Sequence, residues 1–122
     1  MRDYYNIASS TLDGLSGLFV VRLNTGSKVY EGHFPGSPVS PGVCNILMIL
    51  ECAEKIVQQP IRVQKISRCR FTTLISPLTH PELEIHIELQ SKENSLYTLN
   101  ASIGKGEETY LTIKADIVSD SE

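Results

Sequence analysis

The sequence predicts a single α+β domain, spanning residues 1–122, in which an antiparallel sheet covers one central helix. Two observations lead to this fold class. The stretch from residue 41 to about residue 58 is apolar with helical periodicity. Several other segments alternate between apolar and polar residues, as strands with one buried face do. A sheet with one apolar face has to pack against another element, and this helix is the one available.

The predicted helix is apolar on nearly every side in its first half, so we expect that half to be buried all round. Its second half, residues 51–59, turns polar and should emerge into solvent. Pro60 then ends it.

Ahead of the helix, the pattern is weaker. Residues 3–12 predict a first strand or a short lead-in, and residues 15–23 predict a clear strand. Residues 24–26, Asn-Thr-Gly, are typical of a hairpin turn, so residues 28–31 are expected to form a short return strand.

Four strands are predicted after the helix. They are expected at residues 61–71, 82–89, 95–103 and 109–118, separated by a break at 77–81 and turns at 91–94 and 104–106, with a polar tail at 119–122. In the first of these, the apolar residues at odd positions are Ile61, Val63, Cys69 and Phe71.

Length and composition limit the possible functions. The 122 residues suffice for one core, and a net charge of −3 argues against general nucleic-acid binding. The longest apolar run, residues 46–50, is too short for a bilayer, and the first residues show no signal region. The cysteines, Cys44, Cys52 and Cys69, are odd in number and lack metal-ligand spacing. We therefore expect a reduced, cytoplasmic protein without metal, with the cysteines in the core.

The most informative stretch is residues 32–43, Gly-His-Phe-Pro-Gly-Ser-Pro-Val-Ser-Pro-Gly-Val. Its prolines make a stiff loop, so His33 is expected to be held in place, and imidazole suits proton transfer near neutral pH. Ser40 is predicted to cap the helix, with Pro41 in the first helical position. The first free amide then belongs to Gly42, and bare amides at a helix start attract a developing oxyanion. This combination suits removal of a proton next to a carbonyl.

These twelve residues resemble the active-site signature of the hot-dog-fold 3-hydroxyacyl-[acyl-carrier-protein] dehydratases of fatty acid synthesis. Residues 71–77 also resemble the segment that joins two strands in that family. The resemblance implies a hot-dog fold, in which a curved antiparallel sheet wraps around one long central helix. It implies dehydration of a 3-hydroxyacyl chain to a trans-2-enoyl thioester, with no cofactor beyond the phosphopantetheine of acyl carrier protein. The expected partners are acyl carrier protein and a second subunit, in a homodimer, a higher even oligomer or a heterodimer with a related subunit.

The resemblance also assigns roles to individual residues. His33 falls on the catalytic histidine, and Gly42 falls on the glycine whose amide polarises the thioester carbonyl. The residues expected to shape the loop and the mouth of the acyl tunnel are Phe34, Pro35, Pro38 and Val39.

One position departs from the family pattern. The family places a carboxylate on the helix fourteen residues after the histidine, where this chain has Leu47. The nearest carboxylate is Glu51, one helical turn and roughly 6 Å further along the axis. Leu47 is therefore expected to line the substrate cavity, and Glu51 is the candidate acid. Asn45 could orient a water or hydroxyl. The alternative for Glu51 and Glu54 is that they begin a solvated face.

Three functions remain open from the sequence. The first is a dehydratase of acyl-carrier-protein thioesters, and the second is a thioesterase, since the same fold hosts both. The third is a non-catalytic acyl-binding subunit that pairs with a competent dehydratase, which Leu47 keeps in consideration.

Charged and titratable residues elsewhere have simpler interpretations. His80 is expected in a loop and His86 on the surface. A basic set is predicted either to bind the acidic carrier protein or to form an ordinary polar strand face: Arg62, Lys65, Arg68 and Arg70.

Overall fold

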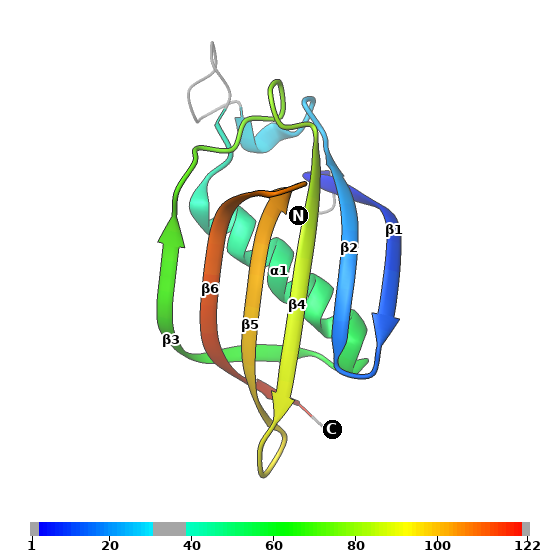
Figure 1. Cartoon of the computed structure of the whole chain (residues 1–122), viewed down its shortest axis with the longest axis vertical. Helices are drawn as coiled ribbons and strands as arrows, with labels where there is room; N and C mark the ends of the chain where they lie inside the picture. Colours follow the sequence, from blue (N-terminus) through cyan, green and yellow to red (C-terminus); the bar gives the residue numbers. More distant parts are fainter. Residues whose placement is uncertain (1–2, 31–38, 121–122) are drawn as a thin grey trace.

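In the described part of the chain, six antiparallel strands form one sheet that wraps around a single α-helix (Figure 1). The computed structural model describes residues 3–30 and 39–120. Its elements are β1 (Tyr5–Asp13), β2 (Ser16–Leu23), the 3-10 helix η1 (Lys28–Tyr30), α1 (Gly42–Val57), β3 (Ile61–Phe71), β4 (Glu82–Ser91), β5 (Leu96–Lys105) and β6 (Glu108–Ser119). The strand order is β1-β2-β4-β5-β6-β3, so β1 and β3 are the edges. The expected α+β architecture is confirmed.

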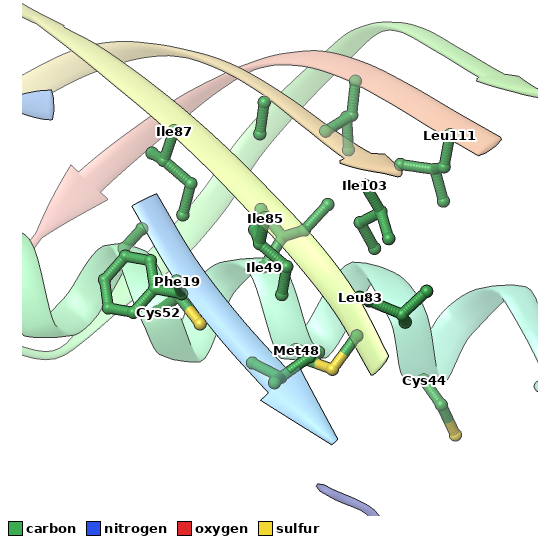
Figure 2. Packing of buried hydrophobic residues seen from close by; sticks show 14 of the residues in the cluster. Phe19, Cys44, Met48, Ile49, Cys52, Leu83, Ile85, Ile87, Ile103 and Leu111 are labelled. Atoms are coloured by element: carbon green, nitrogen blue, oxygen red, sulfur yellow. The ribbon is translucent and has the colours of Figure 1, made fainter. Parts of the chain in front are cut away.

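The core lies between the inner face of the sheet and one side of α1 (Figure 2). The predicted alternation in β4 and β6 is confirmed, because the apolar residues expected on the inner face of each strand are buried. The helix contributes Met48, Ile49 and Cys52, each fully buried. The alternate buried residues of the strands and the buried residues of α1 at helical spacing therefore pack together in one apolar layer. Among the described residues, no helix is long and apolar enough to cross a membrane.

Strand β3 keeps its predicted inward positions only because it contains two bulges. Gln64 is an extra residue between Val63 and Lys65, and Ser67 is a second extra residue before Arg68. Two single insertions restore the odd-numbered pattern, so Cys69 returns to the inner face. Between the bulges, Ile66 lies opposite the buried Ala115 and takes the inner position instead.

The predicted return strand at residues 28–31 is wrong for residues 28–30, which form η1, and residue 31 lies outside the described residues. The preceding turn does form, since the Ser27 N–H donates to the Asn24 carbonyl oxygen at 3.0 Å. A return strand has no place to pair, because the two edges of β2 are occupied by β1 and β4. The segment instead coils over the end of the sheet.

The predicted turn at residues 104–106 is displaced by about two residues. Strand β5 continues through Lys105, and a register shift occurs between Ile103 and Gly104. A Cβ at Gly104 would lie only 2.1 Å from the Glu108 carbonyl oxygen. The close backbone approach at this bulge therefore requires glycine.

The expectation that the first half of α1 is buried on all sides is wrong for the single chain. Val43 is 63% exposed and Leu47 is 40% exposed, whereas Cys44, Met48 and Ile49 are buried. The sheet covers only one side of the helix, so the opposite side stays apolar and open.

We expect Met48→Ala to lower the free energy of unfolding by about 2–5 kcal/mol, because it leaves a cavity between α1 and the sheet. Leu78→Ala is the matched control, since Leu78 is 63% exposed, and it should change the value by less than about 0.5 kcal/mol. Urea unfolding followed by circular dichroism measures both. Equal losses in the two variants would contradict the described core.

Candidate active site

The Gly42 backbone amide, which the sequence predicts as an oxyanion donor, lies at the start of α1. Pro41 occupies the N-cap position with φ −62° and ψ 140°, and its carbonyl oxygen accepts the N–H groups of Cys44 and Asn45. The helix therefore begins at Gly42, whose N–H has no hydrogen-bond partner within residues 3–30 and 39–120. That donor is available to an oxyanion, as expected from the sequence.

Ser40 does not cap the helix, which corrects the sequence prediction. No side chain within residues 3–30 and 39–120 caps α1, and the Ser40 hydroxyl is hydrogen-bonded to Tyr30 instead. Ser40 therefore bonds to a side chain ten residues earlier in the sequence rather than to the amides of the helix start. The described part of the chain consequently offers the amides of the helix start no side-chain acceptor.

Phe71, the last residue of β3, lies against Gly42. A Cβ at position 42 would be 3.0 Å from Cζ of the Phe71 ring. The ring is 49% exposed, so it borders the Gly42 amide on one side and solvent on the other. A larger residue at position 42 would have to displace this ring.

The two ends of the proline-rich segment are joined by a buried hydrogen bond. Tyr30 Oη and Ser40 Oγ are 3.0 Å apart, and both residues are buried. Ser40 is held further by its backbone N–H, which donates to the Ile75 carbonyl oxygen at 2.7 Å. We call Tyr30 and Ser40 the loop clamp, because residues 31–39 lie between them.

A second buried pair lies beside the loop clamp. The Tyr4 hydroxyl donates to Asn45 Oδ1 at 2.6 Å, and the Tyr4 and Tyr30 rings are 6.1 Å apart between centroids. Burial raises the pKa of both phenols, so both remain neutral hydrogen-bonding groups at physiological pH. The Asn45 carbonyl oxygen therefore accepts from Tyr4, which limits its predicted role in orienting a water.

Glu51 also has a specific hydrogen-bond partner and is not fully solvated. The Tyr5 hydroxyl donates to Glu51 Oε1 at 2.6 Å, and both side chains are half-buried. Burial first, and then this bond, raise the pKa of the Tyr5 phenol. Glu54 accepts the Ile61 N–H at 2.9 Å and thereby ties the helix end to β3. Both glutamates remain partly exposed, so the alternative that they begin a solvated face holds only in part.

The helix geometry separates the candidate acid from the candidate oxyanion donor. Gly42 and Glu51 are nine residues apart on α1, which is about 14 Å along its axis. They also point in opposite directions around the helix, toward Phe71 and toward Tyr5 respectively. One chain does not bring them together. Leu47 lies between them on the open side of α1.

The remaining site predictions fall partly outside the described residues. His33, Phe34, Pro35 and Pro38 lie outside them, and Val39 is half-buried beside Ser40. The structure therefore places Gly42, Leu47 and Glu51 and leaves the assignment of His33 as a prediction.

The other titratable groups match their sequence interpretations. His86 is exposed on β4, and His80 lies in the loop before β4, where its Nδ1 accepts the Ser76 N–H. Cys44 and Cys52 are buried, and burial raises the pKa of the Cys52 thiol to about 12, which makes it a poor nucleophile. Within the described ranges, no three His, Cys, Asp or Glu side chains could hold a metal ion.

Sequence reasoning missed the tyrosines of this region. Tyr4 and Tyr5 bond to helix residues 41 and 46 positions away, and such pairings leave no local pattern. The one available signal was a pair of adjacent tyrosines beside a candidate strand, whose hydroxyls need partners when buried.

Comparisons with known proteins identify the family. The family model described as ApeI dehydratase, ApeI-like, matches residues 12–110. No curated protein matches the sequence.

Solved structures support the fold. One is the dehydratase heterocomplex ApeI:P from Xenorhabdus doucetiae, at 16% identity and a TM-score of 0.69 over 93% of this chain and 96% of that one. A second is an uncharacterised protein from Erwinia carotovora subsp. atroseptica, at 18% identity and a TM-score of 0.66 over 97% and 94%. A third is a mutant thioesterase from Staphylococcus aureus subsp. aureus Mu50, at 11% identity and a TM-score of 0.68 over 98% and 96%. The hot-dog fold expected from the sequence is confirmed.

Removing one hydroxyl tests the loop clamp. Tyr30→Phe should lower the free energy of unfolding by about 1–3 kcal/mol, because it leaves the buried Ser40 hydroxyl without its partner. Tyr110→Phe is the control, since that ring is also buried but its hydroxyl makes only a 3.5 Å contact with Glu108. Chemical denaturation compares the two. A clamp variant as stable as the control would show that this bond contributes nothing.

Proposed function

Because the chain belongs to the ApeI-like dehydratase family, we propose that it acts on 3-hydroxyacyl thioesters carried by acyl carrier protein and removes water to give trans-2-enoyl thioesters. The observation that carries the proposal is the uncapped Gly42 amide at the helix start, next to a segment that contains His33 and is joined at its ends by Tyr30 and Ser40. This arrangement supports a base and an oxyanion donor acting on one thioester.

The reaction requires two proton transfers and no redox step. His33 takes the proton from the carbon next to the thioester carbonyl, and the Gly42 N–H stabilises the charge that develops on the carbonyl oxygen. The bond between the β-carbon and the hydroxyl then breaks, and the hydroxide leaves as water once it receives a proton. Phe34, Pro35, Pro38 and Val39 are assigned to the mouth of the acyl channel.

The source of that second proton distinguishes this chain from the family pattern. Leu47 cannot supply it, and Glu51 of the same chain lies about 14 Å from Gly42 along the helix axis. Two routes remain. His33 both accepts and returns the proton, or a carboxylate arrives from a second subunit, with Glu51 of an identical partner as one candidate. The first route lacks an independently tuned acid and should be slow.

A second candidate function is a non-catalytic acyl-thioester-binding subunit that pairs with a competent dehydratase. Two observations favour it: Leu47 stands at the carboxylate position, and one structural neighbour is described as a dehydratase heterocomplex. An assay with 3-hydroxyacyl and crotonyl thioesters separates the possibilities. Enoyl formation or hydration supports the dehydratase, release of free thiol supports the thioesterase alternative, and binding without conversion supports the binding subunit.

We expect His33→Ala to lower the dehydration rate by about a hundred- to ten-thousand-fold without unfolding the protein, because general-base groups contribute that much. His86→Ala, at an exposed position on β4, is the matched control and should keep the full rate. Steady-state kinetics, with circular dichroism as the folding check, measures the difference. Equal turnover in the two variants would make His33 a structural residue.

Substitutions on α1 identify the acid. If His33 returns the proton itself, or if a non-identical subunit supplies the acid, Glu51→Gln should leave the rate unchanged, and Leu47→Glu should raise it by restoring a carboxylate at the family position. A large loss in Glu51→Gln would instead make Glu51 the acid of a partner's site. Glu88→Gln, at an exposed position, controls for the change in net charge. Tyr5→Phe shows whether any effect depends on the phenol bonded to Glu51.

A further inference from the structure

The face of the sheet that points away from α1 contains a hollow of about 340 Å³, lined by residues of β3, β4, β5 and β6. Figure 1 shows this face, with α1 behind the strands. On the two middle strands, β5 and β6, the lining includes the short side chains of Ser102 and Thr112, which lie opposite each other. Because the sheet separates this hollow from the helix, it is distinct from the candidate site at Gly42.

Two cations of this hollow are cross-strand neighbours. Lys114 of β6 lies directly opposite Arg68 of β3, and both residues are exposed. Neither side chain has an ion-pair partner among residues 3–30 and 39–120. Like charges that lie directly opposite each other destabilise a sheet, so this pair lowers stability unless a counter-ion lies close to both. The hollow beside the pair has room for such a counter-ion.

The positive charges on the other parts of the strands are mostly matched. Four strand cations form an ion pair with a carboxylate or lie opposite one: Arg22, Arg62, Lys65 and Lys105. Within the described ranges, the strand cations without either are Arg68, Lys114 and Arg70, and Arg70 lies opposite Thr112 of the hollow. The unmatched positive charge of the sheet is therefore gathered at this one place.

Neutral polar groups lie next to the two cations. The side chains of Asn100, Ser102 and Thr112 line the hollow and make no hydrogen bond within the described part of the chain. Asn100 lies opposite Lys114 on the neighbouring strand. Since neighbouring strands are about 4.8 Å apart, one small ligand can reach the cations and these donors together.

This set of groups fits a phosphate better than a carboxylate. A phosphate monoester carries about two negative charges at pH 7 and three acceptor oxygens, which suits a guanidinium, an ammonium group and hydroxyl donors together. A carboxylate offers one charge and two oxygens. The far side of the hollow is lined by Glu88 of β4, which is two strands and about 10 Å from Lys114. Its carboxylate can accept hydrogen bonds from hydroxyl groups on the part of the ligand that carries the phosphate.

We propose that this hollow, the outer-face site, binds a small polar phosphate monoester. Arg68 and Lys114 hold the phosphate, the neighbouring amide and hydroxyl groups donate to its oxygens, and Glu88 accepts from the polar end. The inference uses neither His33 nor Gly42, so it stands apart from the proposed function. The same phosphate chemistry occurs in free sugar or glycerol phosphates and in the headgroup of phosphatidic acid.

The test is a titration of the ¹⁵N-labelled full chain, followed by NMR, with sn-glycerol 3-phosphate, inorganic phosphate and acetate at constant ionic strength. Glycerol 3-phosphate should shift the backbone amide signals of Ser102, Thr112 and Lys114 and saturate. Its affinity should exceed that of acetate by about tenfold or more, since charge-assisted hydrogen bonds to a second charge are added.

Arg68→Gln with Lys114→Gln should weaken glycerol 3-phosphate binding by about tenfold or more, because both charged donors are removed. The matched control is Lys28→Gln with Lys55→Gln, which makes the same change in net charge at exposed positions outside the hollow, and it should keep the wild-type affinity. If the first double variant fails to fold, Lys114→Gln against Lys55→Gln makes the same comparison.

A vesicle arm distinguishes the two sources of phosphate. The protein is sedimented with phosphatidylcholine vesicles that do or do not contain phosphatidic acid. Binding that requires phosphatidic acid and is lost in Arg68→Gln with Lys114→Gln assigns the site to the lipid headgroup. A saturable response to glycerol 3-phosphate without vesicle binding assigns it to a free ester.

Four results would overturn the proposal. One is the absence of both a saturable response to glycerol 3-phosphate and vesicle binding. Another is an equal loss of affinity in the two double variants. A third is a set of shifts centred on Gly42, which would place the anion at the helix start. The last is binding of inorganic phosphate alone, with neither ester bound, which would show an adventitious anion site.

Discussion

The packing of α1 into the inner face of the sheet is the constraint on which the other features depend. Six helix residues are buried there, and the fully buried ones include Met48, Ile49 and Cys52. These contacts fix both the rotation and the axial position of the helix. The rotation leaves Val43 and Leu47 on the open side, and the axial position sets where the Gly42 amide emerges. The core therefore determines both the open apolar side of α1 and the position of the candidate oxyanion donor.

The loop clamp and the pair beside it connect that core to the candidate active site. Tyr30 and Ser40 join the two ends of the proline-rich segment, while Tyr4 binds Asn45 at the first turn of the helix. Each bond is buried, so breaking it costs more than breaking the same bond in water. The N-terminal residues, η1 and the helix start thus form one hydrogen-bonded unit. This unit fixes Tyr30 relative to Ser40, the residues on either side of the segment that contains His33.

Local sequence patterns predicted most of this fold. The predictions that failed did so because contacts with residues distant in the sequence overrode the local pattern. Alternation in β4 and β6 and the periodicity of α1 depend only on which face is buried, so they were readable from the sequence. Residues 28–30 failed as a strand because neighbouring strands had already occupied both edges of β2. Ser40 failed as a cap because Tyr30, ten residues earlier, takes its hydroxyl. At the site, the free amide of Gly42 could be predicted because the preceding Pro41 has no N–H. The hydrogen bonds from Tyr4 to Asn45 and from Tyr5 to Glu51 join residues far apart in the sequence, and such pairs leave no periodic pattern.

The same constraint bears on the missing acid at Leu47. Moving Glu51 to the position of Leu47 would require a shift of one helical turn, about 6 Å, along the axis. That shift would drag Met48, Ile49 and Cys52 out of the layer they fill, so the helix cannot slide to supply a carboxylate. Substitution at position 47 or a group from outside the chain are the remaining routes. Leu47 lies on the open side of α1. The external route therefore requires a second subunit that covers this side of the helix.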